Sequence, residues 1–259
     1  MAQYVTTVES ELTASCTLNL PEKRNPISAA MRSALIGELE LLRVKPSVRA
    51  VIITGAGSAF CSGLDLEALA AQATLSPAEH LADSQSIADF MAYLAAYPKP
   101  TIAAVNGPAV AGGAGLAMLC DITVVSTKAY FSFSEVKIGF VPAIVGVYLQ
   151  RIIGPKAARE ILLSGRKVSA DEAVSLGLAN KAATPDDLLR TAAEFADLIA
   201  RNSPAAVTAT KKLLYRGENG SIEEGIKSAV EINAQARSSA DCKEGVQSFL
   251  EKRPPQWFS

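Results

Sequence analysis

The stretch TIAAVNGPAVAGGAGLAMLCDITVVST, residues 101–127, decides the fold. It opens with an apolar run, passes through a turn with four glycines within residues 107–115, and continues as an apolar segment whose first charge is Asp121. A second apolar run follows at once. Uninterrupted hydrophobic runs are typical of strands that are covered on both faces. The stretch therefore predicts a strand, a glycine-rich turn, a helix and a second strand inside a layered, parallel-rich α/β core.

The neighbouring segments continue this alternation of strands and helices. Strand-like patterns occupy residues 4–11, 14–20, 48–55 and 129–133. Apolar residues recur at helical spacing within residues 28–44 and 86–97. Ser28 is a favoured N-cap residue for the first of these helices.

The C-terminal part of the chain has a different pattern, because the strand-like runs stop at about Pro185. Amphipathic helices are expected within residues 186–202, 204–217, 221–239 and 241–253. A helical tail of this kind either caps the core or supplies a surface for oligomer formation. We expect a core over residues 1–195 and a helical region over residues 196–259.

The composition favours a small ligand over a macromolecule. The chain has 259 residues, enough for one substantial core, and 25 basic residues balance 26 acidic ones. Balanced charge gives no field that attracts nucleic acid or a membrane surface, so neither is expected as a partner. The N-terminal segment lacks the pattern of a targeting signal, and no window is long enough to span a membrane. We therefore expect a cytoplasmic protein.

Few residue types are available for chemistry. The four cysteines lack the spacing of a zinc site or of a disulfide framework, so no metal is expected. His80 is the single histidine, and a Ser-His-Asp triad or a Cys-His pair would have to depend on it. Acid–base chemistry is therefore expected from a carboxylate, a lysine, a tyrosine or water.

Two glycine-containing turns follow the strongest strands, and neither has a P-loop or a complete dinucleotide-binding pattern. If residues 113–120 form a helix, the Gly112 N–H lies at its positive end, where it can stabilise an oxyanion. The Leu64 N–H in the other turn is a candidate for the matching donor. One such donor contributes ~2.7–4 kcal/mol to a transition state. The alternative is that the glycines only permit close packing of helix and strand.

Glu135 is a candidate general base. It follows a short aromatic strand and precedes an apolar loop that contains glycine and proline. Burial in such surroundings raises the basicity of a carboxylate. A salt bridge with Lys137 or exposure to solvent is the simpler alternative. The neighbouring Ser132 and Ser134 are expected to bond to nearby backbone.

Taken together, these motifs resemble the crotonase superfamily, also called the enoyl-CoA hydratase/isomerase family. The resemblance covers nearly the whole chain and includes LNLPEKRNPIS, VIITGAGSAFCSGLDL, the opening stretch, AYFSFSEVKIGFVPAIVG and LLSGRKVSADEAVSLGLANKA. It implies an α/β spiral of ββα repeats with a C-terminal helical trimerisation region. It also implies a homotrimer or homohexamer, and a coenzyme A thioester as substrate with no further cofactor.

The same resemblance assigns site residues. It places the thioester oxygen between the N–H groups of Leu64 and Gly112, with the reaction passing through an enolate-like thioester. The candidates for contacts with the substrate or its coenzyme A are Lys23, Arg24, Ser62, Asp65, Leu66, Gly113 and Val141.

The sequence departs from the family pattern at one position. Typical hydratases of the family hold the added water with two glutamates, of which the second corresponds to Glu135 and the first to Gly115.

The pattern is most similar to the methylglutaconyl-CoA and carboxygeranoyl-CoA hydratases, which act on branched, carboxylated acyl chains. We expect hydration of a short or branched 2-enoyl-CoA by a single catalytic glutamate. A Δ3,Δ2-enoyl-CoA isomerase, a decarboxylase and a non-catalytic scaffold or RNA-binding protein are the alternatives.

Overall fold

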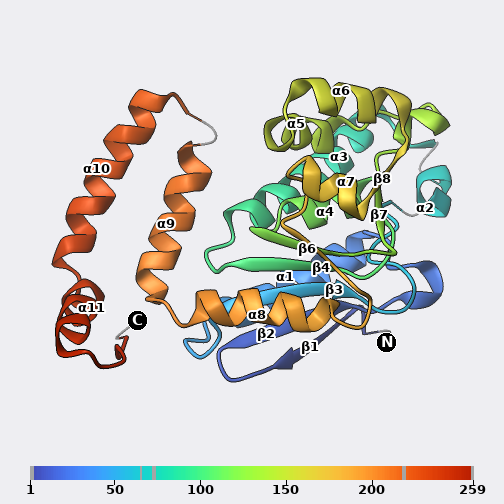
Figure 1. Ribbon diagram of the computed structural model, residues 1–259. Helices are drawn as coiled ribbons and strands as arrows, with labels where there is room; N and C mark the ends of the chain where they lie inside the picture. Colours follow the sequence, from blue (N-terminus) through green and yellow to red (C-terminus); the bar gives the residue numbers. More distant parts are fainter. Residues whose placement is uncertain (1–2, 65, 72–73, 218–219, 258–259) are drawn as a thin grey trace.

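The main sheet has six strands and forms the base of the molecule (Figure 1). The computed structural model describes residues 3–64, 66–71, 74–217 and 220–257. Across the sheet the strands are β1 (Val5–Glu9), β2 (Thr13–Leu18), β3 (Ala50–Gly55), β4 (Thr101–Val105), β6 (Ile122–Ser126) and β9 (Lys181–Ala183). β1 and β2 pair antiparallel, and every other pair in this sheet is parallel.

The central strand β3 is buried along its whole length and separates two hydrophobic cores. Successive side chains of a strand point to opposite faces of the sheet. Ala50 and Ile52 accordingly belong to the core that packs against α8 (Leu188–Ala200). Val51 and Ile53 belong to the larger core, which includes residues of α1 (Ala29–Arg43). A strand covered on both faces explains the continuous apolar runs in the sequence.

A second, smaller sheet carries the chain toward the site. It consists of β5 (Ala109–Val110), β7 (Tyr130–Ser132) and β8 (Lys167–Ser169). β5 and β7 are parallel, with Val110 beside Ser132. The six strands predicted from the sequence are confirmed, with shorter bounds. β5, β8 and β9 were not predicted, because their two or three residues lack the aromatic run that marks the equally short β7.

The helices around the smaller sheet are mostly short. They are η1 (Pro21–Lys23), α2 (Leu66–Ala71), α4 (Gly112–Met118), η3 (Glu135–Ile138), α5 (Ala143–Ile152), α6 (Pro155–Ser164) and α7 (Ala170–Ser175). The predicted helix after Ser28 is confirmed as α1, and the Ser28 side chain accepts a hydrogen bond from the Met31 N–H.

Helix α3 (Pro77–Ala96) is longer than the segment predicted at residues 86–97. Its start lies in a polar stretch without helical periodicity, where a capping box fixes it. The Ser76 hydroxyl accepts from the Glu79 N–H at 3.4 Å, and the Ser76 N–H donates to the Glu79 carboxylate at 2.7 Å. The polar stretch around His80, which in the sequence has the character of a surface helix start, is therefore part of α3 together with the periodic segment.

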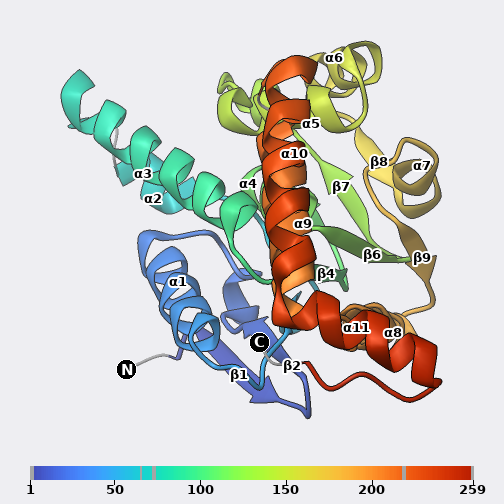
Figure 2. The same ribbon diagram turned by 90° about the vertical axis from the view of Figure 1, so that its left-hand side faces the viewer.

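Three C-terminal helices form an arm that stands beside the core (Figures 1 and 2). They are α9 (Pro204–Gly217), α10 (Ile222–Ser238) and α11 (Ala240–Glu251), and α9 and α10 lie side by side. Lys211 on α9 ties the arm to the core, because its ammonium group lies 2.6 Å from the Asp121 carboxylate and donates to the Lys99 carbonyl at 3.0 Å. Within the described ranges, no helix combines the length and apolar character needed to cross a membrane.

Candidate active site

A cavity of about 250 Å³ brings together several of the residues singled out in the sequence. Its walls come from segments far apart in the chain, and most of the side chains that line it are apolar. Among the described lining residues the polar side chains are those of Ser62, Ser84, Ser134 and Glu135. Ionisable chemistry in this cavity therefore falls to one carboxylate.

Glu135 lies at the first position of η3, directly after the loop that leaves β7. The residue is 8% exposed, and its Oε2 atom has no hydrogen-bond partner within the described residues. Burial raises the pKa of the Glu135 carboxyl, and a hydrogen bond with its own backbone N–H opposes only part of that shift. The salt bridge with Lys137 that the sequence left open is absent between these two described residues.

The two backbone N–H groups expected to face an oxyanion belong to neighbouring segments. The Val110 N–H donates to the Cys61 carbonyl at 2.9 Å, which joins the segment before Gly112 to the segment before Leu64. A Cβ atom placed on Gly63 would lie 3.4 Å from the Gly112 nitrogen. Neither the Leu64 N–H nor the Gly112 N–H donates a hydrogen bond within the part of the chain that the structure describes. Both residues line the cavity.

The backbone at Ala111 turns sharply to begin α4. Its φ of 50° and ψ of −121° lie in a region that residues with a side chain rarely adopt, at a cost of about 1–3 kcal/mol. The Ala111 N–H donates to the Ser132 carbonyl at 2.7 Å, which holds this conformation. The turn leaves Gly112 as the first residue of α4, where the N–H has no partner in the helix. Nothing in the sequence signalled it, because alanine is not a turn residue.

Gly115 lies behind the cavity wall and does not line it. A Cβ atom on Gly115 would meet Val145 Cγ1 at 2.8 Å and Met91 Cε at 3.1 Å. Met91 on α3 and Val145 on α5 are both buried and both line the cavity. The place that a first glutamate occupies in the family pattern is therefore filled by two apolar side chains.

Gly113 is required for close packing. A Cβ atom at this position would lie 2.3 Å from the Cys61 carbonyl oxygen, which no arrangement of side chains can accommodate. The buried Cys61 itself is no candidate nucleophile, because burial raises the pKa of its thiol to about 12. The packing alternative considered for these glycines thus applies to Gly113, whereas the neighbouring Gly112 lines the cavity.

The remaining predicted contact residues surround the mouth of the cavity. Ser62 and Val141 line it, and Lys23 and Arg24 are exposed on an adjacent turn. The Arg24 carbonyl accepts from the Ser62 N–H at 2.9 Å, which fixes that turn against the cavity.

The buried Asn25 braces the same turn. Its side-chain amide donates to the carbonyls of Ala56 and Ala59, both at 2.9 Å. Leu66 begins α2, while Asp65 lies outside the described residues.

Several lining residues were not found from the sequence. Ile27, Ile87 and Met91 come from α3 and from the loop before α1, and they reach the cavity only through tertiary packing. In the sequence they belong to ordinary helical or loop patterns. Ser132 and Ser134 were expected to bond to backbone, yet neither hydroxyl makes a hydrogen bond to the described residues. That expectation was wrong.

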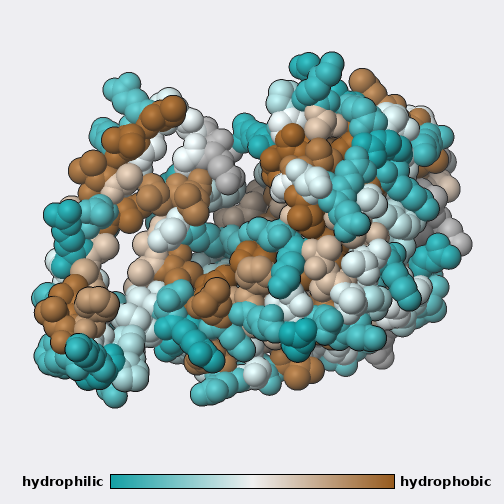
Figure 3. Space-filling view, viewed as in Figure 1, coloured by the Kyte–Doolittle hydropathy of each residue, from teal (hydrophilic) through white to brown (hydrophobic). Residues whose placement is uncertain are grey.

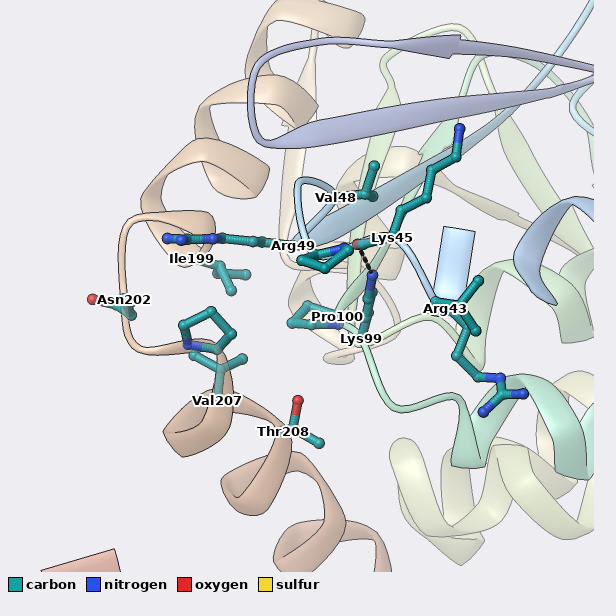
Figure 4. A pocket seen from close by; sticks show the side chains of 13 residues that line it. Arg43, Lys45, Val48, Arg49, Lys99, Pro100, Ile199, Asn202, Val207 and Thr208 are labelled. Atoms are coloured by element: carbon teal, nitrogen blue, oxygen red, sulfur yellow. Dashed lines mark hydrogen bonds between the residues drawn. The ribbon is translucent and has the colours of Figure 1, made fainter. Parts of the chain in front are cut away.

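A second hollow, of about 180 Å³, lies where the loop after α1 meets the junction of α8 and α9. Figure 4 shows that Arg43, Lys45 and Arg49 extend from it in different directions. The ammonium group of Lys99 is already engaged, because it donates to the carbonyls of Leu42 and Lys45, both at 2.6 Å. Because these cations do not converge, we interpret the hollow as a packing gap. No group of three or more potential metal ligands occurs among the described residues.

Comparison with known proteins gives matches along nearly the whole chain. The model of the enoyl-CoA hydratase/isomerase family matches residues 9–259. A candidate enoyl-CoA hydratase of Thermus thermophilus is 45% identical over 250 residues, which cover 96% of this chain and 99% of that protein. Mevalonyl-coenzyme A hydratase of Aspergillus fumigatus is 38% identical over 252 residues, covering 93% and 89%.

The fold agrees equally well with solved structures. The crystal structure of an enoyl-CoA hydratase from Mycobacterium smegmatis superposes with a TM-score of 0.93 at 35% identity and covers 99% of both chains. The match confirms the α/β fold class expected from the sequence.

The packing at Gly115 leads to a stability prediction. Gly115→Ala is expected to lower the free energy of unfolding by about 1–3 kcal/mol, because the added methyl group overlaps Val145 and Met91. Urea denaturation measures this difference. Gly37→Ala is the matched control, since a Cβ there meets no atom within 4 Å in the middle of α1, and it should stabilise the protein by about 0.8–1.0 kcal/mol. Equal unfolding free energies for the two variants would contradict the close packing at Gly115.

Burial of Glu135 predicts a stability difference that depends on pH. A carboxyl whose pKa is raised by folding stabilises the fold fully while it is protonated, and this contribution is lost as the pH rises through the raised pKa. Glu135→Gln should therefore be more stable than the wild type at about pH 7 and should lose that advantage by about pH 4. Thermal unfolding at both pH values measures it.

Glu79→Gln is the control, because its effect on stability at neutral pH should have the opposite sign to that of Glu135→Gln. Hydrogen bonds from Ser76 lower the pKa of Glu79, so this variant should be less stable than the wild type at neutral pH. A Glu135→Gln variant that follows the same trend would show that Glu135 is stabilised in its ionised form.

Proposed function

The chain belongs to the enoyl-CoA hydratase/isomerase family, and we propose that it is a hydratase that adds water to a short or branched 2-enoyl-CoA thioester. The observation that carries the proposal is the buried carboxylate of Glu135, which lines the same cavity as Leu64 and Gly112 and has one oxygen without a partner among the described residues. The family acts on coenzyme A thioesters and needs no cofactor beyond the coenzyme A of the substrate.

In the proposed reaction, the thioester oxygen accepts hydrogen bonds from the Leu64 and Gly112 N–H groups. These donors stabilise the negative charge that develops on that oxygen as water adds to C3. The ionised Glu135 takes one proton from the water while the water oxygen bonds to C3. The resulting carboxylic acid then donates this proton to C2, which gives the 3-hydroxyacyl thioester and regenerates the carboxylate.

The environment of Glu135 suits a group that must act first as base and then as acid. Its pKa is raised by burial, which makes the carboxylate a stronger base than an exposed glutamate. A pKa closer to the working pH also favours return of the proton. Lys23 and Arg24, on the turn bonded to Ser62, are assigned to the phosphates of coenzyme A at the cavity mouth.

The lining of the cavity supports an uncharged acyl chain. No lysine, arginine or histidine is among the described residues that line it. A free carboxylate on the acyl chain would be buried without a cation and close to Glu135, and an unpaired buried charge is costly. We therefore favour a short or branched hydrocarbon chain over the carboxylated chain of a methylglutaconyl-CoA type substrate.

A Δ3,Δ2-enoyl-CoA isomerase is the second candidate, and the packing at Gly115 favours it. Isomerisation moves one proton between carbons and needs one carboxylate, whereas the two-glutamate arrangement for water is excluded by Met91 and Val145. The two relatives described above are named as hydratases, which favours hydration.

A panel of thioesters in ¹⁸O-labelled water tests both candidates. Crotonyl-CoA, 3-methylcrotonyl-CoA, 3-methylglutaconyl-CoA and a 3-enoyl-CoA are the substrates, and mass analysis identifies the products. We expect ¹⁸O in the 3-hydroxyacyl product of an uncharged substrate. Glu135→Gln should lower kcat by about 10²–10⁴-fold, because it removes the general acid–base group.

The exposed Glu79→Gln variant is the activity control and should retain the wild-type kcat. Conjugated product without ¹⁸O would replace the hydratase proposal with the isomerase. No turnover of any thioester would favour the non-catalytic alternative.

We also propose that the arm joins copies of this chain into a homotrimer or homohexamer. No residue of α9 or α10 is buried among those described. Ile222, Ile226 and Val230 recur every four residues on α10, so they share one helix face, and they are 87%, 61% and 65% exposed. Figure 3 shows hydrophobic residues along this arm. Exposed apolar area of this kind marks an interaction surface.

The same observations move the proposed boundary of the helical region. The division expected between residues 195 and 196 falls inside α8, which packs against the main sheet along its length and ends with the buried Ala200. We propose that the core extends through α8 and that the oligomerisation region begins at Pro204.

Sedimentation measures the oligomeric state. The double variant Ile226→Glu, Val230→Glu is expected to sediment as a monomer, because the buried charges would be unpaired in the interface. Leu41→Glu is the matched control, since Leu41 on α1 is 60% exposed, close to the 61% of Ile226. A wild-type monomer, or an unchanged oligomer in the double variant, would contradict the proposed role of the arm.

A further inference from the structure

The hydroxyl group of Ser134 is an unassigned polar group in the cavity. Ser134 precedes Glu135 in the chain, and both residues line the cavity. Ser134 occupies the N-cap position of η3, where a serine side chain normally accepts a hydrogen bond from the helix, but this one does not. Its hydroxyl has no hydrogen-bond partner in the described parts of the chain. It is therefore available to a ligand.

The pairing of β5 with β7 places Ser134 close to the proposed oxyanion site. Val110 lies beside Ser132 in the parallel pair, and the Ala111 N–H donates to the Ser132 carbonyl at 2.7 Å. Gly112 follows Val110 by two residues, and Ser134 follows Ser132 by two residues. The same backbone contact joins the segment that carries Gly112 to the segment that carries Ser134 and Glu135, and all three residues line the cavity.

Hydration needs a second polar group besides Glu135. The water that adds to C3 has two protons, and Glu135 takes one of them. The second proton needs an acceptor that orients the water, since a misplacement of about 1 Å costs about 10²-fold in rate. A glutamate at position 115 cannot serve, because Met91 and Val145 fill that space.

The other polar side chains in the described lining are less suitable. The Ser62 hydroxyl points to the Lys23 carbonyl, at 3.5 Å, on the turn outside the cavity. Ser84 belongs to α3 and is exposed. Ser134 is half-buried and adjacent to the proposed base.

We propose that Ser134 is a positioning residue for the added water, an inference that rests on the proposed hydratase function. Its hydroxyl oxygen accepts a hydrogen bond from the water proton that is not transferred. Glu135 takes the other proton, the water oxygen bonds to C3, and the retained proton stays on the oxygen as the product hydroxyl. Glu135 returns its proton to C2, so the serine is unchanged at the end of the cycle.

Two reactions of the same site separate this role from that of Glu135. One is hydration of crotonyl-CoA. The other is exchange of the C2 protons of butyryl-CoA with D₂O, followed by mass analysis, in which a carboxylate removes a C2 proton and returns a deuteron from solvent. Exchange requires the oxyanion donors and Glu135 but no bound nucleophilic water.

Ser134→Ala is expected to lower kcat for hydration by about 10–100-fold. The fold-loss in the rate of C2 proton exchange should be at least ten times smaller than the fold-loss in hydration. Ser134→Thr keeps the hydroxyl and should hydrate at least ten times faster than the alanine variant. Ser175→Ala, at an exposed serine of α7, is the control for a serine outside the site. Thermal unfolding of each variant reports whether the fold is retained.

The outcomes distinguish the inference from the function on which it rests. Unchanged hydration in Ser134→Ala, an equal loss of hydration and exchange, or equal rates for the alanine and threonine variants would overturn the role of Ser134. If the wild-type protein exchanges the C2 protons but does not hydrate crotonyl-CoA, the proposed hydratase mechanism is overturned instead. The same holds if exchange persists in Glu135→Gln.

Discussion

The site depends on a close contact between two backbone segments, residues 61–63 and residues 110–113. The Val110 N–H donates to the Cys61 carbonyl, and two glycines permit the approach. A side chain at Gly63 would meet the Val110 carbonyl at 2.6 Å, and one at Gly113 would meet the Cys61 carbonyl at 2.3 Å. Because this contact is made by backbone, it brings two N–H donors together with little freedom to move. Fixed donors of this kind stabilise developing charge effectively, since they need no reorganisation during the reaction.

The same arrangement works against the stability of the free protein. Ala111 is held in a rarely populated conformation, and one oxygen of the buried Glu135 has no partner within the described part of the chain. Both features cost free energy, and the extensive cores on the two faces of β3 compensate for them. Strain and unpaired polar groups concentrate where function requires them. The cavity therefore combines a rigid frame with groups that a substrate would satisfy.

The helices of the arm leave apolar surface exposed in a single chain. They bury little within one chain, in contrast to α8, whose apolar face packs against the main sheet. Lys211 and Asp121 fix the base of the arm, but the stripe formed by Ile222, Ile226 and Val230 stays largely exposed among the described residues. We regard assembly as the means by which this surface is buried, and the core as the part that shapes the cavity.

The sequence by itself determined the strands that are buried on both faces, the capped helix after Ser28, the helical C-terminal region and the family. It also singled out Glu135, Leu64 and Gly112 as candidates, because glycine-rich turns after strands and a carboxylate in an apolar context are local patterns, and the three residues line one cavity. Tertiary structure alone decided that Met91 and Val145 occupy the space next to Gly115, since their segments are distant in sequence. It likewise decided that Ala111 is strained and that the Ser134 hydroxyl bonds to no other residue that the structure describes. Local patterns report periodicity and turn chemistry, whereas the space left around a side chain depends on which remote segments pack against it.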